Sequence, residues 1–185
     1  MKKYCLIILI IFFNFNAYSS NKENIVSKLE NIYNINFNFE QNVNNKIENG
    51  NCTVQYPKKI FCSYNSSNKK ILVSDGKWLV IKTLASYYRY PLNKTHLNYL
   101  LDKDFLIKKI KKSNHRIIEN KFINFNFNEN ENEINIFFDI DNYNLIGWQT
   151  LDLYQNLSIT YLSSLKINQE IKKNLFKLPE RNDSN

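Results

Sequence analysis

The chain has 185 residues and a formal net charge of +8, a length that suits one domain with a sizeable core. With only three glycines it has no glycine-rich phosphate loop, and neither His96 nor His115 lies in a motif with a serine or cysteine partner, so no catalytic constellation is visible. The lysines are spread, apart from a run over residues 108–112. We interpret this run as a solvated strand or turn, with a docking surface for an acidic membrane partner as the alternative, and we predict no nucleic-acid partner.

Residues 1–19 have the pattern of a secretory signal peptide. Two lysines precede an apolar run over residues 4–13, and Ala17-Tyr18-Ser19 supplies small residues for cleavage. The run is too short for a membrane anchor, and Cys5 lies inside it instead of following small residues, which disfavours lipoprotein processing. We predict an exported mature chain that begins at Ser20.

The mature chain opens with a helix and then a strand. Over residues 22–33, Ile25, Leu29 and Ile32 recur at helical spacing, with Val26 and Tyr33 widening the stripe. We expect a short amphipathic helix that covers a sheet. From Asn34 the period changes to two, which predicts a first strand with one apolar face: Ile35, Phe37, Phe39 and Gln41.

Residues 50–81 read as three consecutive antiparallel strands. Two turn signals separate the apolar runs, Tyr56-Pro57-Lys58 and Asp75-Gly76. Pro57 cannot donate a ladder hydrogen bond and therefore ends the first strand. Asp-Gly between apolar runs favours a type I′ hairpin turn with positive φ at both central positions.

Cys52 and Cys62 lie on like faces of the first two of these strands. The tight turn between them brings the two positions opposite each other, and export permits oxidation, so we predict a Cys52–Cys62 disulfide. Buried free thiols and a metal site are the alternatives. A zinc site is disfavoured because neither histidine is near in sequence and such sites take four N or S ligands.

Alternation fails between Leu84 and Asp102. Residues 86–91 are an irregular aromatic segment, Thr95 is a candidate N-cap, and a short helix follows with Leu97, Leu100 and Leu101 on one face. So short a helix is not stable alone. It either plugs an open end of the sheet or forms a mobile lid over a cavity.

Further strands are expected along the rest of the chain, with Gly147 marking a bulge and residues 180–185 a flexible tail. About ten one-sided strands with few helices predict a mainly β (α+β) domain over residues 20–179, a single strongly curved antiparallel sheet or unclosed barrel. The interior is either filled or encloses a ligand cavity. The strands expected are 107–112, 115–120, 121–128, 134–140, 145–154, 157–165 and 175–178, and the inward side chains are Phe37, Phe39, Val54, Ile60, Tyr64, Phe125, Phe127, Ile136 and Phe138.

Motifs in a characteristic order resemble those of the LolA-type outer-membrane lipoprotein carriers. The central one is the hairpin proline followed by an apolar strand and then ILVSDGKWL over residues 71–79. The others are Phe37-Asn38-Phe39-Glu40-Gln41, Pro91 to Leu97 with Leu100-Leu101, Trp148-Gln149-Thr150-Leu151-Asp152, and Asn174-Leu175-Phe176-Lys177-Leu178-Pro179.

This resemblance implies an incomplete barrel whose helical lid closes a cavity for acyl chains. It implies a monomeric periplasmic carrier, without cofactor, metal or enzymatic activity, that moves lipoproteins from the inner to the outer membrane. The implied partners are acylated lipoproteins, an inner-membrane ATP-driven release complex, and an outer-membrane receptor or the membrane itself. The alternative is a related exported module that binds or senses another amphiphile.

The sequence departs from the family at the latch. Just before the hairpin proline the carrier pattern has an arginine that hydrogen-bonds to the lid, and here that position is Tyr56. Tyrosine offers one hydroxyl where arginine offers five donors. Tyr56 is expected on the inward face, either as a weaker latch to the lid near Leu97–Leu101 or as ordinary aromatic packing.

Overall fold

The structure is a computed structural model that describes residues 20–129, 132–151 and 155–181. The predicted signal peptide and the last four residues of the predicted tail therefore lie outside the described residues. Ser20, the predicted first mature residue, caps the first helix: its hydroxyl accepts from Glu23 N–H and the Glu23 carboxylate accepts from Ser20 N–H.

The architecture is one antiparallel sheet of eleven strands in the order β6-β5-β4-β3-β2-β1-β11-β10-β9-β8-β7. In the described part of the chain β6 and β7 lie at opposite ends of this order, so the sheet does not close. The predicted mainly β, unclosed antiparallel fold is confirmed. The strands are β1 (Asn34–Val43), β2 (Lys46–Gln55), β3 (Lys59–Tyr64), β4 (Ile71–Asp75), β5 (Trp78–Lys82), β6 (Tyr87–Pro91), β7 (His115–Ile118), β8 (Phe122–Glu129), β9 (Asn132–Asp139), β10 (Leu145–Leu151) and β11 (Leu157–Ile167).

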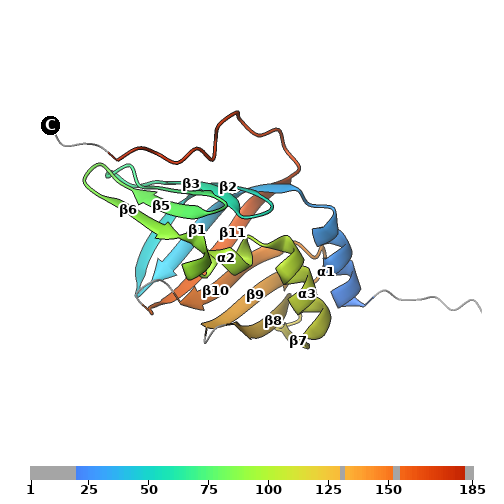
Figure 1. Cartoon of the computed structure of the whole chain (residues 1–185). Helices are drawn as coiled ribbons and strands as arrows, with labels where there is room; N and C mark the ends of the chain where they lie inside the picture. The colour runs from blue at the N-terminus through green and yellow to red at the C-terminus, as the bar shows by residue number, and fades with distance from the viewer. Residues whose placement is uncertain (1–19, 130–131, 152–154, 182–185) are drawn as a thin grey trace, which may run out of the picture.

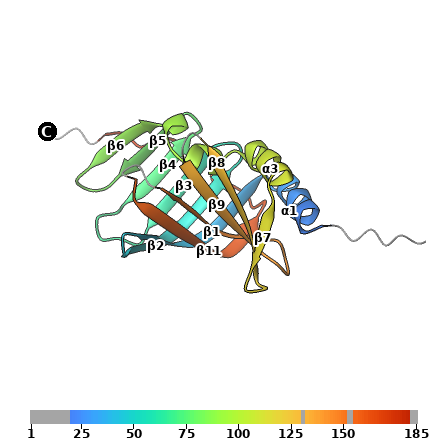
Figure 2. The same cartoon turned by 90° about the horizontal axis from the view of Figure 1, so that it is seen from below.

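Short helices lie against the concave side of this sheet. They are α1 (Asn21–Glu30), the 3₁₀ turn η1 (Leu92–Lys94), α2 (Leu97–Leu100) and α3 (Lys103–Lys112). Figure 1 shows α1 and α3 side by side at one end of the molecule, near β7, β8 and β9. In Figure 2 the sheet curves around α2, which lies in the opening between β4–β5 and β8–β9.

Residues 107–112 are the C-terminal part of helix α3, so the predicted strand there is wrong. The Asp102 carboxylate accepts from Phe105 N–H and caps the helix, while Leu106 and Ile110 are buried one helical turn apart. Lysine pairs on both sides of Ile110 obscure this four-residue spacing in the sequence. The lysines are in the last turn, where they complement the helix dipole.

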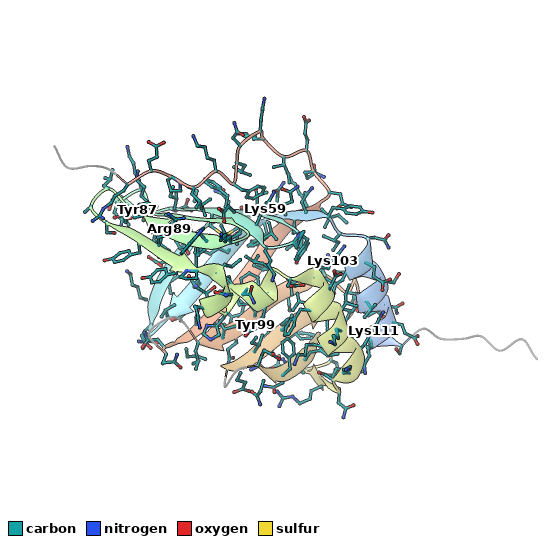
Figure 3. All side chains as sticks on the ribbon, viewed as in Figure 1. Lys59, Tyr87, Arg89, Tyr99, Lys103 and Lys111 are labelled. Atoms are coloured by element: carbon teal, nitrogen blue, oxygen red, sulfur yellow. A yellow bond between two sulfur atoms is a disulfide. The ribbon has the colours of Figure 1, made fainter. Side chains whose placement is uncertain are left out.

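Lysine side chains also join α3 to α1 and to the connection that follows α1. Lys103 Nζ donates to the carbonyls of Glu30 and Ile32, and Lys111 Nζ lies 3.3 Å from a Glu30 carboxylate oxygen. Figure 3 shows Lys103 and Lys111 on α3, on the side of α1. Part of the basic run is therefore occupied in holding the two helices together.

Four smaller expectations are also wrong. Residues 87–91 form β6, which pairs with β5, because the segment's tyrosines suit an edge strand. Thr95 does not cap α2: its hydroxyl donates to the Leu92 carbonyl, and His96 holds the N-cap position. Residues 175–178 form turns outside the sheet. Tyr33 lies beyond the end of α1 and is 67 % exposed, so it does not widen the apolar stripe.

The second hairpin turn differs from the type I′ expectation. Asp75 is the last residue of β4, and Gly76 has positive φ, +100°, whereas Asp75 and Lys77 do not. The Asp75 carboxylate accepts from the N–H groups of Lys77 and Trp78 and so closes the turn itself. The first hairpin has the expected form, because β2 ends just before Tyr56-Pro57-Lys58. The predicted bulge in β10 is confirmed by a register shift between Leu145 and Gly147.

Candidate ligand-binding cavity

Strand register arranges the inner face of the sheet into transverse rows. Phe37, Cys52, Cys62, Leu72 and Ile81 are successive cross-strand partners from β1 to β5. Period-two alternation keeps such partners on the same face. This apolar row is the floor of a cavity.

The cavity has a volume of about 570 Å³, within the usual range for ligand sites of roughly 300–1,000 Å³. It lies between the inner face of the sheet and the start of the segment 95–102, which contains α2 and is called the lid below. Of the predicted cavity residues, Phe37, Phe39, Ile60 and Tyr64 line it, and Leu97 and Leu100 line it from the lid.

A second, much smaller cavity of about 20 Å³ continues beneath the lid. The predicted residues Val54 and Ile136 line it, together with Tyr56 and Leu101. Phe37, Ile60, Leu97 and Leu100 border both cavities. The lid leucines therefore form the boundary between an open chamber and a nearly filled one.

Three predicted cavity residues, Phe125, Phe127 and Phe138, line neither cavity. Phe125 packs edge-on against Phe138, and the Phe127 ring lies 6.0 Å from that of Phe105 on α3. They face inward as expected, but α3 fills the space above them. The interior is thus solid near β8 and β9 and hollow over β1–β5.

Several cavity residues were missed. Leu72, Leu79 and Ile81 follow the same alternation as the residues that were named, so the central strand pattern contained the signal. Trp148, which packs edge-on against Phe37, lies within one of the family-like motifs. Of the polar wall residues, Gln41 was placed on the inward face of the first strand and Thr150 lies within a family-like motif, whereas local sequence offered no comparable signal for Ser158 and Thr160.

The lid is bonded to the first hairpin turn through Lys58. Its N–H donates to the Leu101 carbonyl at 2.7 Å, and its ammonium lies 3.2 Å from an Asp102 carboxylate oxygen. Lys58 has φ +67°, which turns its backbone N–H towards the lid. The contact is two residues away from the position where the family pattern has its arginine.

Tyr56 packs against the lid, and its hydroxyl forms no hydrogen bond with any described residue. Its backbone N–H donates to the Tyr33 carbonyl, and its ring lines the small cavity beside Leu100 and Leu101. Burial raises the pKa of Tyr56 to about 12. The ring is therefore neutral at ordinary pH and adds apolar area to the lid contact.

Tyr64 marks the other end of the cavity. Its ring packs edge-on against Phe39, with the Lys70 ammonium 4.1 Å from the ring centre. Burial, and then the negative charge of Glu48, raises the pKa of the Tyr64 hydroxyl. Lys70 also pairs with Glu48, so a half-buried tyrosine and an ion pair form one side of the mouth of the cavity.

Cys52 and Cys62 face each other directly across β2 and β3. Their sulfur atoms form a disulfide, and the Cα atoms lie 4.1 Å apart. Both residues line the cavity. The link therefore joins the two strands at the centre of the apolar row.

Among the described residues, no group of three or more His, Cys, Asp or Glu side chains is placed to hold a metal ion. Within the same part of the chain, no helix has the length and apolarity needed to cross a membrane.

A curved sheet wrapped around a largely apolar chamber is an arrangement suited to binding apolar or amphiphilic ligands. The family described as "Outer membrane lipoprotein carrier protein LolA" matches residues 30–179. The chain therefore belongs to the LolA family.

Solved structures with a similar fold are distant in sequence. An uncharacterized conserved protein from Thermus thermophilus has a TM-score of 0.51 at 5 % identity, over 88 % of this chain and 96 % of that one. A LolA superfamily protein from Nitrosomonas europaea has a TM-score of 0.43 at 7 % identity, over 86 % and 99 %. The lipoprotein LppX from Mycobacterium tuberculosis has a TM-score of 0.46 at 10 % identity, over 82 % and 95 %. No curated protein matches the chain by sequence.

Proposed function

We propose that the mature protein is a periplasmic carrier that binds the acyl chains of lipoproteins and moves them from the inner to the outer membrane. The observation that carries the proposal is the 570 Å³ chamber, lined by Phe37, Leu72 and Leu79 and covered by Leu97 and Leu100 of the lid. Family membership supports the lipoprotein as cargo.

The energetics explain why such cargo needs a chamber. Each methylene held out of water is worth about 0.8 kcal/mol, so one long acyl chain left in water costs on the order of 10 kcal/mol. An apolar wall removes most of that cost. Handover then has to pass directly to a second apolar site, which in this proposal belongs to an outer-membrane receptor or to the membrane itself.

The remaining parts of the proposal follow from this cycle. Residues 1–19 direct export, and an inner-membrane ATP-driven release complex loads the cavity. The carrier acts as a monomer, without a cofactor and without turnover of a substrate. The polar part of the lid contact at Lys58 is one hydrogen bond and one ion pair, so opening the chamber for loading breaks few polar interactions.

The experiment that tests the proposal is ligand identification and competition. Protein purified from the periplasm should release triacylated lipopeptide, as detected by mass spectrometry. A synthetic triacylated lipopeptide should also displace an apolar fluorescent dye from the cavity, whereas the same peptide without acyl chains should not. A bound glycolipid or free fatty acid, with no lipopeptide, would favour the module for another amphiphile.

A matched pair of variants tests whether the ligand binds in the chamber. Ile81 is half-buried and lines the cavity, so Ile81→Trp fills part of the volume and should reduce dye and lipopeptide binding. Ile117 is 49 % exposed on β7 and lines neither cavity, so Ile117→Trp is the control. Equal binding by the two folded variants would contradict the chamber as the binding site.

A further inference from the structure

The chamber changes from apolar to polar along β1. Phe37 and Phe39 lie on the inner face, and Gln41 comes next on the same face. In the row of Phe39 the partner on β11 is Leu162; in the row of Gln41 it is Thr160. The lining of the chamber therefore changes from aromatic rings to hydroxyl and amide groups between Phe39 and Gln41, which are two residues apart on β1.

Four side chains make up this polar end: Gln41, Thr150, Ser158 and Thr160. Gln41 pairs with Thr160 across β1 and β11, and Ser158 pairs with Thr150 across β11 and β10. The Gln41 amide donates to the Ser158 hydroxyl at 2.9 Å. This bond fixes both side chains and leaves the Ser158 hydroxyl proton free to be donated.

Thr160 gives the strongest indication of a ligand. Its side chain is 4 % exposed, and its hydroxyl oxygen is buried without a hydrogen-bond partner among the described residues. A buried hydroxyl without a hydrogen-bond partner destabilises the folded protein, because it has lost its hydrogen bonds to water. A valine side chain at this position would have the same shape and no such penalty. His96 Nε2, on the lid side of the same chamber, is also buried and without a partner in the described chain.

The chemistry of the polar end selects a neutral acceptor. Its hydroxyl and amide groups are uncharged donors, and the lysines that border the chamber, Lys46 and Lys70, are both paired with Glu48. The Glu48 carboxylate, which borders the chamber beside Gln41, disfavours a second anion. Ester and amide carbonyls suit these donors better than a free carboxylate or a phosphate.

We propose that Gln41, Thr150, Ser158 and Thr160 bind the ester and amide carbonyls that join acyl chains to the cargo's head. This inference rests on the proposed acyl-binding function and adds an orientation to it. The chains lie along Phe37 and Phe39 towards the lid, and the head leaves the chamber near the β1–β2 hairpin, which lies away from α1 and α3 in Figure 1.

The test compares two lipopeptides of equal chain length, one with ester-linked acyl chains and one with ether-linked alkyl chains. Both present the same hydrocarbon, but the ether analogue lacks the ester carbonyls. The wild-type protein should bind the ester form about three- to tenfold more tightly, the range for one or two net hydrogen bonds. Thr160→Val should remove most of this preference, because it should weaken binding of the ester form much more than binding of the ether form.

A matched control separates this effect from a general change in the sheet. Thr53 on β2 is half-buried and lines neither cavity, so Thr53→Val should retain the ester preference. Thr160→Val should also unfold at the same or a higher temperature than the wild type, because it removes an unpaired buried hydroxyl.

The outcomes are distinguishable. Equal wild-type affinity for the ester and ether forms would overturn the inference and leave the carrier proposal intact. An ester preference that survives in Thr160→Val, or a folded Thr160→Val that loses both ligands alike, would also overturn it. Failure of the wild type to bind either lipopeptide would overturn the carrier proposal itself.

Discussion

The two wings of the sheet carry the same inward-facing apolar pattern, yet one is solid and the other is hollow. Over β8 and β9, α3 brings Phe105 against Phe127, and Ile123, Phe125 and Ile136 are almost completely buried. Over β2–β5 the helical cover is the short lid, and Leu72, Leu79 and Ile81 line the chamber.

This difference shows that alternation decides which side chains point inward, while helix placement decides whether the space between them is filled. A ten-residue helix covers one wing, and a four-residue helix covers the other. The disulfide joins two strands within the hollow wing, and both of its cysteines line the chamber. The expected effects of mutations therefore differ between the wings in both size and kind.

The largest effect is expected from Ile136→Asp in the solid wing. Ile136 is 1 % exposed, so the variant buries an unpaired carboxylate. The cost is comparable to the roughly 5–15 kcal/mol that holds a small domain folded. Circular dichroism should show no cooperative unfolding transition. Ile47→Asp, at a site on β2 that is 58 % exposed, is the control and should unfold like the wild type. A normal transition in Ile136→Asp would mean that the faces of β9 are assigned backwards.

A phenylalanine pair compares the wings directly. Phe125→Ala removes a ring packed between Phe138 and His115 and should cost about 3–5 kcal/mol in urea unfolding. Phe39→Ala removes a ring that already borders the chamber, so its cost should be clearly smaller. Phe39→Ala should, however, change dye binding directly. Phe125→Ala should change dye binding only to the extent that it lowers the fraction of folded protein. Equal stability losses would remove the distinction between the wings.

Removal of the disulfide in the hollow wing should have an intermediate effect on the free energy of unfolding. The double variant Cys52→Ala/Cys62→Ala should lose roughly 2–3 kcal/mol, because the ten-residue loop is no longer closed in the unfolded chain. Thiol labelling of unreduced, denatured protein should find no free thiol at these two positions. Two labelled cysteines would contradict the link.

The smallest effect on stability is expected at the latch. Asp102→Asn keeps a side-chain oxygen that caps α3 but removes the ion pair with Lys58. The side chains of Asp102 and Lys58 are each about a third exposed, so the loss of stability should be about 0–1 kcal/mol. The lid should nevertheless open more often, and the empty protein should bind more apolar dye.

Tyr56→Phe is the matched control for the latch. It keeps the aromatic packing and removes a hydroxyl with no recorded partner among the described residues, so dye binding should stay at the wild-type level. If Tyr56→Phe raises dye binding and Asp102→Asn does not, the Tyr56 hydroxyl holds the lid closed. That result would support the sequence-based interpretation of Tyr56 as a weaker latch over the interpretation as aromatic packing.

Much of the fold was predictable because strand signals are local. Alternation located β1, β8 and β9, and the proline-ended hairpin placed Cys52 opposite Cys62. The helix at residues 103–112 was missed because lysine pairs on both sides of Ile110 obscure the four-residue spacing of Leu106 and Ile110, which are both buried in the fold. The edge strand β6 was missed because its pairing with β5 gives an aromatic segment its regular backbone.

The inward side chains were therefore determined by the sequence itself, since the two-residue period of a strand is a property of the backbone. The tertiary structure decided which of them enclose a chamber. Phe39 and Phe127 have the same local pattern, but only Phe39 faces open space, because α3 packs over Phe127. The tertiary structure also determined which side chains form the polar end of the chamber. The pairing of β1 with β11 makes Gln41 a neighbour of Ser158, which lies 117 residues further along the chain.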